Sequence, residues 1–135
     1  MEALRRSEER HDCLILVCCA QPLQLSGTPA LIHVTRSPLH PEVEAVKRVI
    51  GLEGDVVFTR KPYPYQHATV PSGHIWVEGD GGHGGKSSLD SNYYGPISMN
   101  LVTGRVTYAL WPWRSAGPIN WWEWKPKTKV IKAKR

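Results

Sequence analysis

Glycine and proline recur along this chain at intervals that leave little room for long helices. The 135 residues include 12 Gly and 11 Pro, and the apolar runs between them are short and rich in Val, Ile and Thr. Gly and Pro interrupt helices, whereas short β-branched runs between turn signals are typical of strands. The length fits one domain with a modest core. The sequence therefore predicts an all-β domain rather than a helical bundle.

Five strand-like segments follow an irregular N-terminal region that extends to about residue 30. These segments are Leu31 to Arg36, Ala45 to Ile50, Asp55 to Arg60, His74 to Glu78 and Arg105 to Trp111. We expect them to form an antiparallel, twisted β-domain over residues 31–114, with a long glycine-rich loop (79–92) at its rim. Residues 1–30 are expected to be atypical and poorly packed, and residues 115–135 form a Trp-rich, basic tail.

The formal charge of +5 is concentrated at the C-terminus. Residues 125–135, KPKTKVIKAKR, hold five Lys and one Arg without an acid, so the rest of the chain is close to neutral. Such a segment is either a solvated, frayed tail or a contact for an anionic membrane surface or an acidic partner. No motif for reading nucleic acid is present, so we expect no nucleic-acid partner.

The tryptophans are also clustered, because five of the six lie between Trp111 and Trp124. Trp is favoured at the interface between membrane and water. Two interpretations remain open at this point. Either Trp111 and Trp113 close the β core and the rest is disordered, or Trp121, Trp122 and Trp124 hold the domain on a membrane together with the basic tail.

The cysteines lie at one end of the chain, at Cys13, Cys18 and Cys19. They lack metal-ligand spacing and have no later cysteine to bridge to, so we expect free thiols and no metal site. The apolar run at 13–20 is too short for a transmembrane helix, which needs about 20 residues. Acidic residues before it argue against a signal or transit peptide. We therefore expect no membrane anchor in this sequence.

Residues 78–92, EGDGGHGGKSSLDSN, resemble a phosphate-binding loop at first sight. The motif G-x-x-x-x-G-K-[ST] requires a glycine five positions before Gly85, where this chain has Asp80. A carboxylate there would repel a phosphate. The residues after Ser88 are turn-forming and end in a Gly-Pro breaker, whereas the motif opens a helix. We therefore reject nucleotide binding by this loop.

The second predicted strand carries two adjacent cations. A period of two places them on opposite faces, and the two faces consist of Ala45, Lys47 and Val49 on one side and Val46, Arg48 and Ile50 on the other. From the pattern alone, each cation is most simply a solvent-facing residue of an edge strand, where lysine discourages aggregation.

Three segments, in this order, resemble the motif boxes of the type I signal peptidase family. They read VKRVIGLEGD at 46–55, VPSGHIWVEGD at 70–80 and SLDSNYYGPI at 88–97, and LWP at 110–112 fits as well. Within the family the chain looks most like the second subunit of the mitochondrial inner membrane peptidase. Asn92 stands where many relatives have Arg, which is typical of that subunit.

The resemblance implies a serine endopeptidase that uses a Ser–Lys dyad and needs no cofactor. In it, Lys47 would be the general base. A lysine with the ordinary pKa of about 10.4 is charged at neutral pH, but burial against apolar neighbours such as Ala45 and Val49 lowers the pKa of an amine. Arg48 cannot lose its proton and is a poor candidate.

Ser88 and Asp90 also match the family's motif. The resemblance implies that the Ser88 hydroxyl orients the Lys47 amine and that Asp90 supports the loop by accepting hydrogen bonds. An ordinary Asx or Ser turn would explain both residues without catalysis. These two alternatives stay open from the sequence.

The nucleophile is not identified. Relatives carry it in an S-M-x-P-T-L box, and only Ser26, in SGTPAL, is a weak candidate here. If the first two strands form a hairpin with Arg36 opposite Ala45, Lys47 faces Val34, eight residues beyond Ser26. An extended path of that length spans roughly 26 Å at about 3.3 Å per residue, so only a sharp reversal after Ser26 would bring it to Lys47. We expect that residues 1–30 replace the usual anchor and nucleophile box.

The resemblance implies a subunit of the mitochondrial inner membrane peptidase that removes sorting signals from proteins delivered to the intermembrane space. Its expected partners are polypeptide presequences, a sister subunit in a hetero-oligomer and the inner membrane surface on the intermembrane-space side. The alternative is a catalytically inactive form that docks to the sister subunit and stabilises it.

Overall fold

The computed structural model describes residues 2–6, 14–18, 32–79, 89–111, 113–120 and 127–134 of this chain. These residues are mainly in antiparallel strands, so the predicted all-β class is confirmed as a mainly β fold with one short helix. The strands are β1 (Glu2–Arg6), β2 (Leu14–Cys18), β3 (Ile32–Arg36), β4 (Glu44–Gly51), β5 (Val56–Phe58), β6 (His67–Thr69), β7 (His74–Glu78), β8 (Ile97–Ser98), β9 (Val102–Trp111), β10 (Gly117–Pro118) and β11 (Val130–Ile131). One short helix, α1 (Ser91–Tyr94), and two 3-10 turns, η1 (Met99–Leu101) and η2 (Trp113–Ser115), complete the elements.

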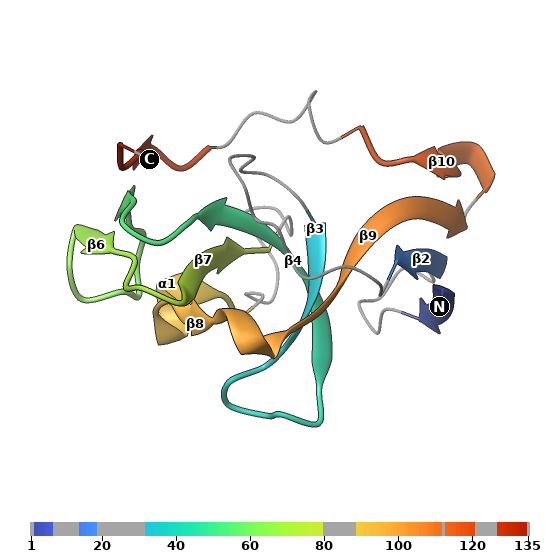
Figure 1. Ribbon diagram of the computed structural model, residues 1–135, viewed down its shortest axis with the longest axis horizontal. Helices are drawn as coiled ribbons and strands as arrows, with labels where there is room; N and C mark the ends of the chain where they lie inside the picture. The colour runs from blue at the N-terminus through green and yellow to red at the C-terminus, as the bar shows by residue number, and fades with distance from the viewer. Residues whose placement is uncertain are drawn as a thin grey trace.

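The strands form two sheets. The larger has the order β1-β2-β9-β3-β4-β7-β8, with β10 added to β9, and the smaller has the order β11-β5-β6. Figure 1 shows β6 at one end of the molecule and β2 and β10 at the other, with β3 and β4 between them. The strands β4 and β7 therefore lie in the interior of the larger sheet.

Two apolar clusters are built on β4 and β7. The first contains Val49, Leu52, Ile75, Val77, Ile97 and Val102. The second contains Ile50, Val57, Val70 and Trp76. Because successive side chains of a strand point to opposite faces, neighbours such as Trp76 and Val77 enter different clusters. The larger sheet is therefore covered on both faces here, which explains the nearly continuous apolar runs in β4 and β7.

The predicted strands agree well with those observed. The bounds of β7 are as predicted, those of β3 differ by one residue at the start, and those of β4 differ by one residue at each end. The strand β9 begins three residues earlier than expected, and β5 is shorter because Arg60 lies in the loop after it.

The hairpin of β3 and β4 forms as expected, but its register differs by one residue. Arg36 pairs with Glu44 and Lys47 with His33, so the predicted pairing of Arg36 with Ala45 and of Lys47 with Val34 is wrong. The reason is the closure of the loop, in which the Ser37 amide donates to the Val43 carbonyl (2.9 Å). The faces of β4 are unchanged, because they depend only on alternation within the strand.

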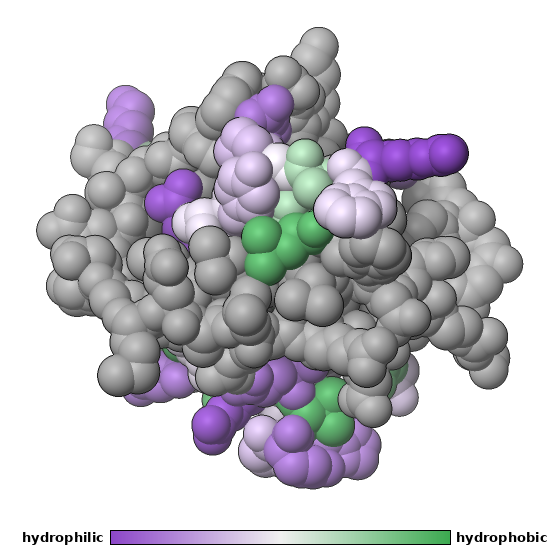
Figure 2. All heavy atoms as spheres, turned by 90° about the vertical axis from the view of Figure 1, so that its right-hand side faces the viewer, coloured by the Kyte–Doolittle hydropathy of each residue, from purple (hydrophilic) through white to green (hydrophobic). Residues whose placement is uncertain are grey.

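This hairpin projects from the lower part of the molecule in Figure 1. Its tip carries two apolar side chains, Leu39 and Val43, which are 49% and 43% exposed. Figure 2 shows hydrophobic spheres at the same lower end, next to hydrophilic ones. The tip is therefore an exposed apolar site that stands apart from both clusters.

The N-terminal region is more regular than predicted. The expected irregular backbone is not observed for residues 2–6 and 14–18, because β1 pairs with β2 and β2 pairs with β9. The sequence of β2 contains residues with high β-propensity, such as Ile15 and Val17. The strand pairs along one edge of the long strand β9. Residues 19–31, which include Ser26, lie outside the described residues.

The C-terminal segment also departs from one expectation. A frayed tail is ruled out for residues 127–134, because Val130 pairs with Val57 and Ile131 with Val56. The side chain of Trp113 is 76% exposed, so it does not close the core. Trp121, Trp122 and Trp124 lie outside the described residues, as does most of the glycine-rich loop, residues 80–88.

Candidate functional site

Lys47 lies in the middle of β4, between two neighbouring strands. On one side β4 pairs with β3, where Lys47 is opposite His33, and on the other β4 pairs with β7, where Arg48 is opposite Glu78. Lys47 is 5% exposed and Arg48 is 6% exposed. Both cations are thus buried in an interior strand, and the interpretation as solvent-facing edge residues is wrong.

The alternation of β4 separates the surroundings of the two cations. Lys47 lies on the same face as Val49, which belongs to the first apolar cluster. Arg48 lies on the face of Ile50, which belongs to the second cluster. The structure thus places the Lys47 side chain on the face lined by aliphatic residues, as the sequence period indicated.

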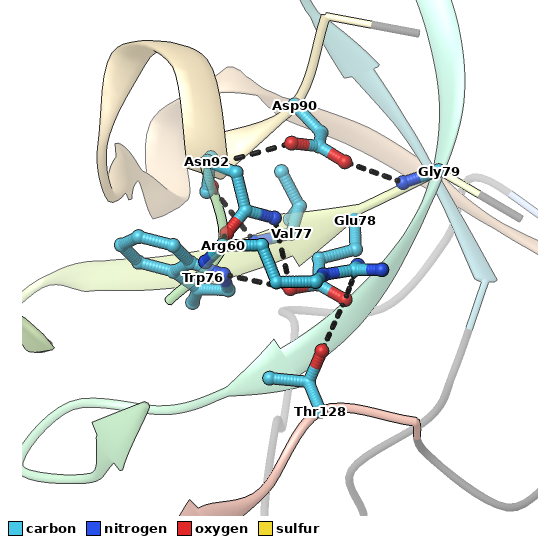
Figure 3. A network of polar contacts seen from close by, with 9 residues as sticks. Arg60, Trp76, Val77, Glu78, Gly79, Asp90, Asn92 and Thr128 are labelled. Carbon is cyan, nitrogen blue, oxygen red and sulfur yellow. Dashed lines mark hydrogen bonds and ion pairs between the residues drawn. The ribbon is translucent and has the colours of Figure 1, made fainter. Parts of the chain in front are cut away.

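Residues 89–91, the described part of the S-x-D-S box (88–91), lie beside the edge of β7. The Asp90 carboxylate accepts hydrogen bonds from the Asn92 amide (2.9 Å) and the Gly79 amide (3.4 Å), as Figure 3 shows. The Ser91 hydroxyl accepts from the Val77 amide (2.9 Å). The strand β8 pairs with β7 only at His74 and Ile75. Beyond the end of β8, no strand among the described residues pairs with the Val77 and Gly79 amides on this edge. The side chains of the box accept their hydrogen bonds instead.

Asp90 is also the N-cap of α1, because its side chain bonds the amide two residues later. The helix ends after one turn at Gly95, whose φ of 86° lies in the left-handed region that favours glycine. The prediction that this stretch would be turn-forming and end at Gly-Pro is consistent with a single helical turn.

A buried carboxylate, Glu78, lies at the end of β7 and accepts four hydrogen bonds. Its donors are the guanidinium of Arg60 (2.6 Å), the hydroxyl of Thr128 (2.7 Å), the side-chain amide of Asn92 (3.0 Å) and the indole of Trp76 (3.3 Å). Figure 3 shows these groups converging on the carboxylate. A buried charge requires such compensation. Glu78 thus joins β7 to the β5–β6 loop, to α1 and to the C-terminal segment.

Asn92 connects this network to Asp90. Its side-chain oxygen accepts from the Arg60 amide (2.7 Å), while its nitrogen donates to Glu78 and its backbone amide donates to Asp90. An arginine has no acceptor atom, so it could not bond the Arg60 amide in this way. The side-chain amide of Asn92 therefore supplies both the acceptor that the Arg60 amide needs and the donor that Glu78 needs.

The GLEGD part of the first box forms a tight turn beside the site. A Cβ on Gly51 would lie 2.7 Å from a methyl carbon of Val57, so a larger residue does not fit. The buried Asp55 carboxylate accepts from the amides of Leu52 (3.0 Å) and Ala133 (2.9 Å). Asp55 thereby fixes both the turn and the C-terminal segment.

Tyr94, the last residue of α1, packs against the first cluster. Its burial, together with the nearby Asp90 carboxylate, raises the pKa of Tyr94 from 10.0 to about 12. The phenol therefore stays neutral throughout the physiological range.

Of the predicted site residues, the structure describes Lys47 and Asp90. Lys47 belongs to β4, and Asp90 belongs to the segment that is hydrogen-bonded to the end of the neighbouring strand β7. Ser88 and Ser26 lie outside the described residues. No sequence pattern predicted that Glu78, Asn92 and Thr128 form a network. For Glu78 the sequence offered one signal, an acidic residue at the end of an apolar strand. For Thr128, which lies within the basic C-terminal segment, the sequence offered no signal.

In the described part of the chain, no helix has the length and apolar character needed to cross a membrane. The same residues contain no group of three or more His, Cys, Asp and Glu side chains arranged to hold a metal ion.

Comparison with known proteins identifies relatives of this chain. It is 40% identical over 104 residues to mitochondrial inner membrane protease subunit 2 of Schizosaccharomyces pombe, which covers 77% of this chain and 56% of that protein. It is 43% identical over 90 residues to subunit 2 of Danio rerio (67% and 44%) and 43% identical over 83 residues to subunit 1 of Homo sapiens (60% and 48%). No family model matches the sequence. The chain spans about half the length of the curated relatives it matches.

The ordered boxes, the mainly β fold and these relatives make the chain similar to proteins of the signal peptidase class. More narrowly, it is a homologue of the mitochondrial inner membrane protease subunits. Relatives named subunit 1 and subunit 2 occur at similar identities.

Proposed function

We propose that this chain carries the serine–lysine endopeptidase domain of a mitochondrial inner membrane peptidase subunit, the second subunit in particular. Its substrates are polypeptide sorting signals, and it works on the intermembrane-space side together with a sister subunit. The names of the relatives support this assignment at the level of the family. The activity, the partner and the side of the membrane are part of the proposal.

The observation that carries the proposal is the burial of Lys47 in the interior strand β4. A catalytic lysine has to act as a neutral amine, and burial on an aliphatic face disfavours the ammonium form. In this mechanism the Lys47 amine takes the proton of the nucleophilic hydroxyl and then delivers it to the leaving amine. Lys47 would thus act as general base and general acid in turn.

Ser88 and Asp90 have supporting roles in the proposal. The Ser88 hydroxyl orients the Lys47 amine. Asp90 holds the loop that carries Ser88, and its bonds to Gly79 and Asn92 support this role because they fix the chain directly after Ser88. No nucleophile is assigned to this chain, and Ser26 remains a weak candidate.

The test is cleavage of a presequence peptide by the purified full chain, alone and with its sister subunit. Lys47→Met keeps the volume of the side chain without its amine, and we expect cleavage to fall by about 10²- to 10⁴-fold. The matched control is Lys61→Met, at an exposed lysine, and it should cleave like the wild type. Full activity of Lys47→Met would contradict the assignment of the base.

The same assay separates the alternative function. A chain that shows no turnover of its own, copurifies with the sister subunit and raises that subunit's thermal stability would be an inactive docking partner. Ser26→Ala belongs in the series, because a loss of cleavage in that variant, with the Lys61→Met control active, would assign the nucleophile.

A further inference from the structure

The smaller sheet, β11-β5-β6, has one face in the core and one face outside. Val57 pairs with Ala68 on one side and with Val130 on the other. All three pack in or against the second cluster, beside Trp76. Because strand side chains alternate, the residues before and after Val57 and their cross-strand partners must face outward.

The outer face has an apolar centre. Ile131, which pairs with Val56, is 53% exposed, and Phe58 is 38% exposed. The ammonium nitrogen of Lys129 lies 5.1 Å from the centre of the Phe58 ring. This contact holds a cation beside the exposed apolar residues.

The charge of this sheet has a single sign. Residues 56–69 and 127–134, which contain all three strands, hold six Lys and Arg residues and no Asp or Glu. Arg60 pairs with Glu78, whereas the other five carry exposed side chains: Lys61, Lys127, Lys129, Lys132 and Lys134. Every exposed charged side chain within these residues is therefore a cation.

We propose that this outer face, named here the β11 face (Val56, Phe58, Lys129, Ile131 and the flanking lysines), docks on an anionic lipid bilayer. Phe58 and Ile131 enter the headgroup region, while the lysines lie against lipid phosphates. Two observations favour a bilayer over an acidic protein. Five lysines on flexible stems suit a fluid layer of charge better than a fixed constellation of carboxylates. In the sequence, three tryptophans (Trp121, Trp122 and Trp124) lie within the six residues before Lys127, and Trp is typical of the membrane interface.

This inference does not depend on the proposed protease activity, and its test is a binding measurement. The full chain is sedimented with phosphatidylcholine vesicles that contain or lack phosphatidylglycerol, at low and high salt. We expect binding only to the vesicles with phosphatidylglycerol, and a decrease as salt is added.

The decisive variant is Phe58→Ser/Ile131→Ser, which removes the apolar centre and leaves every charge in place. Its affinity for the anionic vesicles should fall about tenfold or more. The matched control is Leu39→Ser/Val43→Ser, which removes two equally exposed apolar side chains from the hairpin tip and should bind like the wild type. Circular dichroism verifies that both variants fold.

A second variant covers the case in which the first does not fold. Lys132→Glu/Lys134→Glu changes only exposed side chains and should abolish binding to anionic vesicles. Equal binding by wild type and either face variant would overturn the proposal. So would equal binding to neutral and anionic vesicles, or capture by a polyglutamate resin without any binding to vesicles.

Discussion

Glu78 is a carboxylate enclosed by protein, and its four donors come from four different segments. Glu78→Ala would leave Asn92, Trp76 and Thr128 without their acceptor, while the half-exposed Arg60 could still reach water. We expect the free energy of unfolding to fall by about 2 to 4 kcal/mol, measured as a lower urea midpoint. Glu42→Ala, at an exposed carboxylate, should change it by less than about 0.5 kcal/mol. A Glu78→Ala midpoint equal to that of Glu42→Ala would contradict a structural role for the network.

Tyr94 gives a pH dependence with a defined sign. Its pKa is about 12 in the folded chain and 10.0 ordinarily, so the unfolded chain releases this proton first as the pH rises. The contribution of Tyr94 to stability is complete below pH 10, falls between about pH 10 and 12 and is then lost. Tyr94→Phe should therefore lose less stability than the wild type between about pH 9 and pH 11 in urea titrations. Parallel losses in the two proteins would contradict the raised pKa.

Among single residues, the sequence could indicate those that stand within an ordered motif. Lys47 and Asp90 are predicted as site residues because three boxes appear in the family's order, and the alternation of β4 predicts the face of Lys47. Thr128 could not be found in this way. Its partner Glu78 is 50 positions away in the chain, and no local pattern reports a contact at that distance.

At the scale of elements, the edge of β7 beyond the end of β8 is capped by side chains rather than by a further strand. Asp90→Ala removes the acceptor for the Gly79 amide, and Ser91→Ala removes the acceptor for the Val77 amide. Each bond is worth about 1 kcal/mol, so we expect hydrogen exchange of the affected amide to accelerate about fivefold in each variant. The Val49 amide, in the interior strand β4, provides the internal reference.

The pattern across the two variants is the informative result. Asp90→Ala should act on Gly79 and Ser91→Ala on Val77, each with little effect on the other amide. A uniform acceleration throughout the sheet would mean that the box stabilises the whole fold and does not specifically cap this edge.

The predictable and unpredictable elements differ in length. The strands of five or more residues from β3 onward have enough alternating or apolar residues to be read locally, and β7 was predicted at its observed bounds. The strands β6, β8, β10 and β11 have only two or three residues, and pairing partners define them. The strand β11 lies within a basic sequence that suggested solvation, and only its register with β5 places Val130 against the second cluster.

For the whole molecule, the C-terminal segment closes the fold around the candidate site. Thr128 bonds Glu78, Val130 and Ile131 pair with β5, and the Ala133 amide bonds Asp55. The first and second boxes of the resemblance are thus both attached to the last residues of the chain. This organisation leaves the β11 face outward while the network around Glu78 stays inside.

The central claim is that Lys47 and the S-x-D-S box form one site. Its most direct test is an experimental structure of the full chain that resolves the distance between the Lys47 amine nitrogen and the Ser88 hydroxyl oxygen. We expect a hydrogen bond of about 2.7 to 3.2 Å between these atoms, with Asp90 still bonded to the Gly79 amide. A Ser88 hydroxyl directed away from Lys47, and too far from it to be bridged by one water molecule, would contradict the claim.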